Sequence, residues 1–167
     1  MAYPRITLGG VPIDIRAGEV SESDDPITAD VVVRMGQGGG VKLTHWRKAA
    51  GTINGGGGLM PVALDGLDYS QPLELRLTSP ETMSGVGTSF LLHCDPRPDQ
   101  APWAYAEVAG RQVRTPCVAL GRAVTVTAVA GAERYIVQWM PKYWVFAKKP
   151  PRERSRSYAW SILWEEV

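Results

Sequence analysis

The fold class is decided by the stretch Arg122-Ala-Val-Thr-Val-Thr-Ala-Val-Ala-Gly-Ala-Glu-Arg-Tyr-Ile-Val-Gln-Trp-Met140. Its first eight residues alternate in polarity, which is the two-residue period of a strand with one buried face. Gly131 and Ala132 then turn the chain into a second strand-like segment, residues 135–140. The stretch therefore predicts two consecutive β-strands.

The same pattern continues outward in both directions. Gly9-Gly10 separates two short apolar segments, and two glycines suit the positive φ angles of a tight hairpin turn. Ala109-Gly110 separates another pair of strand-like segments in the same way. No window keeps a helical period over three turns. We therefore predict an all-β fold, a β-sandwich or barrel-like domain. The further predicted strands are residues 5–8, 11–15, 29–35, 41–48, 72–78, 103–108, 111–115, 143–147 and 158–165.

Glycine, proline and polar residues mark the expected connections. Residues 17–28 are acidic and contain Pro26, which predicts a loop. Gly36–Gly40 and Gly55–Gly58 are interpreted as flexible or tightly turning loops. Pro141 cannot donate a ladder hydrogen bond, so it should bulge or end its strand.

Composition limits the class of protein. The chain has 167 residues, which suits a single domain spanning 1–167, and a formal net charge of +1. That balance gives no overall attraction to nucleic acid or to an anionic membrane. No apolar run reaches the roughly 18 residues of a membrane helix, and no secretory signal is recognised at the start. We expect folding in a cytoplasm, with Cys94 and Cys117 as two buried thiols and not as a disulfide.

Candidate catalytic residues are few. The glycine runs lack the Lys-Ser or Lys-Thr pair and the helix of a phosphate loop. His93 and Cys94 are sequence neighbours, so on an extended strand they point to opposite faces. Asp65 and Asp68 lie in turn-like sequence, where aspartate commonly bonds its own backbone. We predict no catalytic, cofactor or metal site, and no enzyme activity.

Two features indicate contacts with other proteins. Trp46 shares a strand face with Lys42, which is consistent with an interface. The run from Lys148 to Arg156 contains five basic residues, Lys148, Lys149, Arg152, Arg154 and Arg156. It fits a soluble hairpin tip, a contact with an acidic neighbouring subunit, or a nucleic-acid contact; since no aromatic residue interleaves the charges, we expect no nucleic-acid binding. A carbohydrate-binding module that uses Trp46 or Trp103 as a stacking platform is the main alternative.

Several segments together resemble a known family. They are Ile6-Thr-Leu-Gly-Gly-Val-Pro-Ile13, Val33 to Lys48, Ile53-Asn-Gly-Gly-Gly-Gly58, Leu64 to Arg76, and Tyr158-Ala-Trp-Ser-Ile-Leu-Trp-Glu-Glu-Val167. The chain resembles small structural proteins of the tails of long-tailed bacteriophages, most closely a distal tail or tail-tip ring protein.

The resemblance implies a β-sandwich virion subunit that forms a ring, commonly of six copies, between the tail tube and the tip or hub proteins. It also implies a long β-hairpin arm that reaches a neighbour, for which residues 135–166 are the candidate, with the basic loop 148–156 at the tip. A tail tube or terminator subunit is a close alternative, because such proteins also form β-rich rings.

Overall fold

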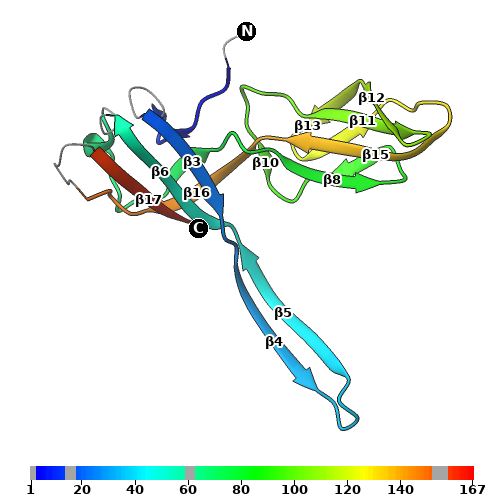
Figure 1. Ribbon diagram of the computed structural model, residues 1–167, viewed down its shortest axis with the longest axis horizontal. Coiled ribbons are helices and arrows are strands. Elements are labelled where there is room, and N and C mark those ends of the chain that lie inside the picture. The colour runs from blue at the N-terminus through cyan, green and yellow to red at the C-terminus, as the bar shows by residue number, and fades with distance from the viewer. Residues whose placement is uncertain (1–2, 14–17, 59–62, 152–157) are drawn as a thin grey trace. The chain divides into compact units, whose positions relative to one another are not determined.

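The structure is a computed structural model that describes residues 3–13, 18–58, 63–151 and 158–167 (Figure 1). The all-β prediction is confirmed: the described residues contain strands and one short 3-10 turn, η1 (Leu64–Gly66), and no α-helix. We expected one domain over residues 1–167. The chain instead divides into two compact units, with residues 1–12 and 74–143 in unit 1 and residues 13–73 and 144–167 in unit 2.

Unit 1 is built around two antiparallel sheets that form a β-sandwich. Four strands pair in the order β12-β11-β15-β8, and three pair in the order β13-β14-β9. Phe90, Val124 and Val126 are buried on the smaller sheet, and Ala104 and Val137 on the larger one. The strands are β8 (Glu81–Gly85), β9 (Ser89–Leu91), β11 (Trp103–Val108), β12 (Arg111–Thr115), β13 (Cys117–Leu120), β14 (Ala123–Val126) and β15 (Ala132–Trp139).

The stretch 122–140 forms both expected strands, but the two lie in different sheets. β14 pairs with β13 and β9, whereas β15 pairs with β11 and β8. Alternation along β14 is complete, since Val124 and Val126 are buried and their neighbours are exposed. The turn between the strands therefore carries the chain from one layer of the sandwich to the other.

Both predicted tight hairpins of unit 1 are present. Gly9 and Gly10 have φ angles of 56° and 80° and join β1 (Thr7–Leu8) to β2 (Val11–Pro12). Ala109 and Gly110, with φ angles of 49° and 72°, join β11 to β12. Positive φ at both central residues gives a turn whose twist matches the flanking strands. β1 also pairs with β7 (Leu73–Arg76).

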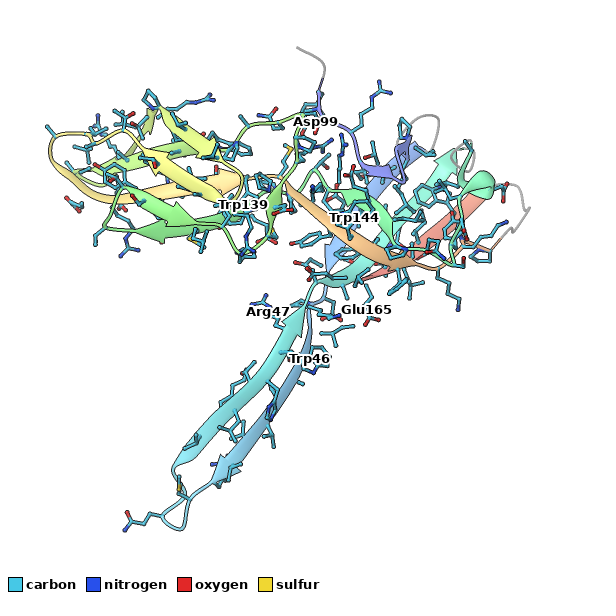
Figure 2. The ribbon with its side chains drawn as sticks, turned by 180° about the vertical axis from the view of Figure 1, so that it is seen from behind. Trp46, Arg47, Asp99, Trp139, Trp144 and Glu165 are labelled. Carbon is cyan, nitrogen blue, oxygen red and sulfur yellow. The ribbon has the colours of Figure 1, made fainter. Side chains whose placement is uncertain are left out.

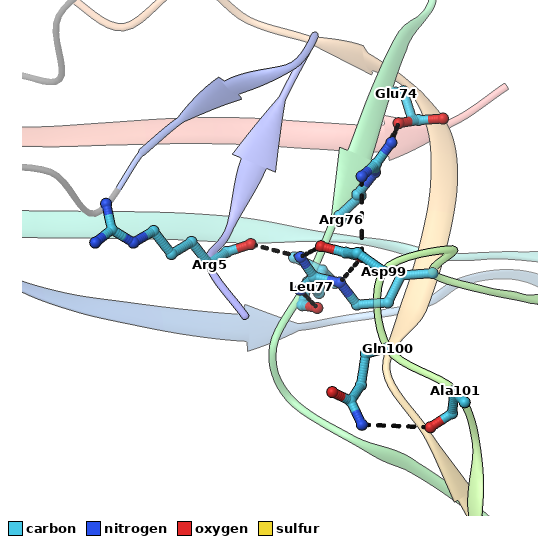
Figure 3. Close-up of polar contacts among 8 residues, drawn as sticks. Arg5, Glu74, Arg76, Leu77, Asp99, Gln100 and Ala101 are labelled. Carbon is cyan, nitrogen blue, oxygen red and sulfur yellow. Dashed lines mark hydrogen bonds and ion pairs between the residues drawn. The ribbon is translucent and has the colours of Figure 1, made fainter. Parts of the chain in front are cut away.

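A buried arginine ties three segments of unit 1 together (Figure 3). Arg97 is only 2% exposed and follows β10 (Asp95–Pro96). Its guanidinium donates to the carbonyl oxygens of Leu77 and Arg5, each at 2.8 Å, and to both carboxylate oxygens of Asp99 at 2.8 and 2.9 Å. A buried charge is tolerated when it is paired and hydrogen-bonded, and four hydrogen bonds and the Asp99 carboxylate serve this guanidinium. The Arg97 guanidinium lowers the pKa of Asp99 below its ordinary value.

Unit 2 contains an antiparallel arrangement in the order β16-β17-β6-β3. Its strands are β3 (Gly18–Asp24), β6 (Ala50–Gly58), the later part of β16 (Pro141–Ala147) and β17 (Tyr158–Glu166). Trp160, Ile162 and Trp164 are buried on one face of β17, as their alternation predicted. The side chain of Ile162 lies opposite Ile53 in the register of β17 with β6.

The prediction of a loop at Gly55–Gly58 is wrong, because these glycines belong to β6. Gly55 lies opposite Trp160. A Cβ atom added at Gly55 would lie 2.2 Å from Cζ2 of that indole, so the ring covers the backbone of the strand. Gly55 thus makes space for a large aromatic side chain.

The predicted loop at residues 17–28 is also replaced by strands. β3 covers Gly18–Asp24 and pairs with β6 along seven residues, and β4 begins at Ile27. As the outermost strand of its sheet, β3 needs no apolar alternation, and charged residues are common on edge strands because they discourage unwanted pairing.

Residues 135–166 do not form an extended hairpin. β15 ends at Trp139 in the sandwich, and β16 begins at Pro141, so the predicted strand break at this proline is confirmed. Among the described residues, β16 and β17 pair at 145–147 with 164–166, the N–H of Lys148 donates to the carbonyl of Leu163, and β17 continues along β6. Because both edges of β17 are occupied, this region is part of a sheet and not a free arm.

Candidate assembly interface

The long hairpin of this protein lies earlier in the chain, at residues 27–48, which we call the arm. It consists of β4 (Ile27–Arg34) and β5 (Gly40–Lys48), which form a two-stranded sheet of their own (Figure 1). Nearly every residue of both strands is exposed. The arm turns at Gly38, whose φ angle is +83°. The backbone N–H of Met35 donates a hydrogen bond to the carbonyl of Gly39 across the turn.

One face of the arm is aliphatic. The register places Val31 opposite Leu43 and Val33 opposite Val41, and directly opposite residues share a face. The four side chains are 40–48% exposed. We call them the aliphatic face. Within the described part of the chain, no second sheet packs against these four half-exposed side chains.

The other face of the arm is mixed. It carries Asp30, Val32, Lys42 and Thr44. The register shifts between Thr28 and Asp30, so Arg47 opposes Thr28 on this face, and its neighbour Trp46, which is 48% exposed, points to the other side of the strand (Figure 2). The ammonium group of Lys42 lies 2.6 Å from a carboxylate oxygen of Asp30, and this hydrogen bond lowers the pKa of Asp30. The expectation that Trp46 shares a face with Lys42 is wrong, because the extra residue at this register shift reverses the alternation between Thr44 and Arg47.

An isolated two-stranded hairpin is at best marginally stable in water, because it buries little apolar surface. The arm has about twenty ordered residues, and each costs conformational entropy on ordering. Packing of the aliphatic face against another surface would offset that cost. This arrangement is typical of a segment that is completed by binding.

A second exposed apolar surface lies on unit 2. In β16, Trp144 and Phe146 alternate with buried residues, and their side chains are 53% and 49% exposed. Leu163 of β17 is 52% exposed. Trp144 is labelled in Figure 2. Phe146 and Leu163 line an open groove of about 560 Å³. The full lining is Ser23, Asp25, Ile27, Ala50, Gly51, Thr52, Phe146, Lys148, Leu163, Trp164 and Glu165. We call this the sheet groove.

The predicted basic interface residues are only partly described. Lys148 is exposed and lines the sheet groove. Lys149 is exposed and its ammonium group lies 3.3 Å from a carboxylate oxygen of Asp65. Arg152, Arg154 and Arg156 lie outside the described residues. Thus the structure brings one basic candidate to the groove and places Trp46 on the arm.

Unit 1 contains a polar cluster that sequence reasoning missed. The imidazole of His93 lies 3.5 Å from Glu81, and the hydroxyl of Tyr143 donates to the same carboxylate at 3.2 Å. The indole N–H of Trp139 donates to Sγ of Cys94, and His93 packs edge-on against Trp139. The segment around His93 is bent and not extended, so both neighbours contact one cluster. Burial is the main cause that raises the pKa of Tyr143.

Other candidates have structural roles. Asp68 accepts hydrogen bonds from the backbone and hydroxyl of Ser70, as expected for an aspartate in a turn. The indole N–H of Trp103 donates to Gln138, which engages the polar edge of this proposed stacking residue. Cys94 and Cys117 are not joined in a disulfide; the first is buried and the second half-buried.

Comparisons with known proteins give no match: no family model, no curated protein and no solved structure is similar to this chain. Within the described residues, no group of three or more metal-binding side chains gathers. No helix in that part of the chain is long and apolar enough to cross a membrane.

Proposed function

We propose that this chain is a structural subunit of a bacteriophage tail, which forms a ring at the distal end of the tail and joins the tail tube to the tip proteins. The arm carries this proposal. It is a hairpin whose aliphatic face is left half-exposed, and such a face is stabilised by another protein surface. The resemblance of the sequence to tail-tip ring proteins supplies the biological setting.

The mechanism in this proposal is geometric. An arm that binds a different surface on the next copy makes a heterologous contact, and such contacts close into a ring when the rotation between copies suits. A closed ring buries every arm and leaves no copy unpaired. The β-sandwich of unit 1 then offers further surface to tube or tip proteins.

The first test is the mass of the purified protein by light scattering over a concentration series. We expect a discrete ring, and Val33→Asp should dissociate it, because a carboxylate on the aliphatic face opposes burial. Val32→Asp is the matched control: the same change at the next residue points to the opposite face, beside Lys42. Open-ended polymers would indicate a tube subunit instead.

The second test places the protein in the virion. An antibody to the chain should label the distal end of tails of the phage that encodes it. Label that is absent from the tail, together with a protein that stays monomeric when mixed with tail tube and tip proteins, would refute the proposal.

One observation supports the carbohydrate-binding alternative: the side chain of Trp46 is exposed. It requires glycan binding that Trp46→Ala removes. In the ring proposal, glycan binding is not required, and a glycan array with the wild-type chain separates the two.

A further inference from the structure

We infer that the arm of one copy binds the sheet groove of a second copy of this chain. This inference rests on the proposed function, because it names the partner surface of the proposed subunit contact. It is drawn from two apolar surfaces and from the distribution of charge around them.

The two surfaces have matching character. The aliphatic face presents Val31, Val33, Val41 and Leu43, which span two residue steps on each strand, roughly 7 Å at about 3.4 Å per residue. The sheet groove presents Phe146 and Leu163, both about half exposed, on the outer face of a sheet. Two sheet faces that pack with their apolar side chains interleaved form a stable layer.

Charge favours this pairing over the pairing of two arms. The arm carries four basic residues and one acid, a formal charge of +3; the basic residues are Arg34, Lys42, Arg47 and Lys48. Two arms side by side would repel each other. Long basic side chains also reach round the edge of a two-stranded ribbon, so their charge acts on both faces.

One edge of the sheet groove has the opposite charge. The segment 18–25, which contains the edge strand β3, has four acids and no basic residue, a formal charge of −4. Its last residue, Asp25, lines the groove, as does Glu165 of β17. Lys148 is the single basic residue in the lining. Groups within about 10 Å of each other still interact at moderate salt, so a basic arm is attracted to this edge.

The contact is heterologous, because the aliphatic face and the sheet groove are different surfaces of one chain; the arm contributes Ile27, at its base, to the groove lining. Each copy uses its arm on one neighbour and its groove on the other, which is the geometry of a ring. This property gives a test that a symmetric contact between two arms cannot pass.

The test mixes two variants that are each defective on one side of the contact. Val33→Asp disables the arm, and Leu163→Asp disables the groove. We expect each variant alone to be monomeric, with an apparent dissociation constant raised by roughly a hundredfold or more, because each buries an unpaired carboxylate. An equimolar mixture should give a dimer and nothing larger, since one intact arm and one intact groove remain.

Two controls keep the result specific. Leu91→Asp makes the same change at an exposed leucine of β9 in unit 1 and should assemble like the wild-type chain. Circular dichroism and thermal unfolding of Leu163→Asp should match those of Leu91→Asp, which excludes misfolding as the cause. Raising the salt concentration should weaken the wild-type assembly, as expected for opposite charges.

The outcomes separate this inference from the proposed function. If Leu163→Asp assembles normally while Val33→Asp does not, the arm binds elsewhere; the inference is then overturned and the tail-ring proposal stands. If the mixture stays monomeric, the contact is not heterologous and the inference is equally overturned. If the wild-type chain stays monomeric up to its solubility limit, a second copy is not the occupant. Only its failure to join tail proteins as well would remove the proposed function.

Discussion

Substitution of Gly55 by alanine should destabilise unit 2 although it adds a single methyl group. The new Cβ would lie 2.2, 2.4 and 2.8 Å from Cζ2, Cε2 and Nε1 of Trp160. Carbon atoms in contact prefer about 3.6 Å, so the indole must move by roughly 1.4 Å. The ring is 5% exposed and its neighbours Ile53 and Ile162 are fully buried, so little room exists for that shift.

The expected cost is about 2 kcal/mol. Overpacking of a well-packed core costs roughly 1–3 kcal/mol. Replacing glycine by alanine in a strand returns only about 0.5 kcal/mol through the unfolded chain. Urea unfolding followed by tryptophan fluorescence measures the difference, with Gly39→Ala as the control, because a Cβ at Gly39 meets nothing within 4 Å.

A double-mutant cycle tests the cause. Trp160→Leu is itself destabilising, but it removes the ring that the added methyl group would touch. In that background Gly55→Ala should cost less than about 0.5 kcal/mol, and the coupling between the two positions should be roughly 2 kcal/mol. Equal losses in both backgrounds, or a Gly55→Ala chain as stable as the Gly39→Ala control, would show that the ring does not impose the glycine.

Three further predictions concern unit 1. Arg97→Met should lower the free energy of unfolding by about 3 kcal/mol, because the carbonyls of Leu77 and Arg5 lose their donor; a loss below about 0.5 kcal/mol in urea denaturation would contradict this. The pKa of Asp99 is lowered in the folded chain, so its stabilisation is full above its ordinary value of 3.8 and is lost as the pH falls through the lower folded value. Asp99→Asn should therefore remove part of the acid-induced loss of stability, and an unchanged pH profile of unfolding would argue against the ion pair. Native alkylation by iodoacetamide, followed by mass spectrometry, should be slow at Cys117, where burial raises the thiol pKa, and slower still at fully buried Cys94; faster labelling of Cys94 would contradict its burial.

The strands with strict alternation could be predicted from the sequence, and so could their tight turns. β14 and β17 keep a two-residue period, which follows directly from the pleat. The turns at Gly9-Gly10 and Ala109-Gly110 join neighbours in sequence, so local conformation alone defines them. All-β architecture is the sum of such local signals.

Strand pairing could not be predicted, because it depends on residues distant in sequence. Ile162 pairs with Ile53, and the sequence around either residue does not identify its partner. Gly55 has its explanation in Trp160, more than a hundred positions later. The acidic strand β3 lacks an apolar period, because only its backbone is needed at the edge of a sheet.

The candidate interface was partly predictable. Both strands of the arm follow from the sequence, but the register shift that separates Trp46 from Lys42 does not, and the arm was expected at residues 135–166. Alternation does not reveal whether a hairpin has a third strand beside it. The run Val31-Val32-Val33 is the available signal, since three consecutive valines put aliphatic groups on both faces of an exposed strand.

The position of β17 in unit 2 has a consequence for biosynthesis. β17 lies between β16 and β6, yet it is translated after every other strand of that unit, and the whole of residues 74–143 is made in the interval. The ribosome therefore releases β3 and β6 with an open edge long before the tryptophans that cover the glycines of β6 exist. Unpaired edges on nascent chains invite pairing between molecules. In a cell that produces many copies at once, the delay before β17 arrives sets the time during which newly made chains are vulnerable to aggregation.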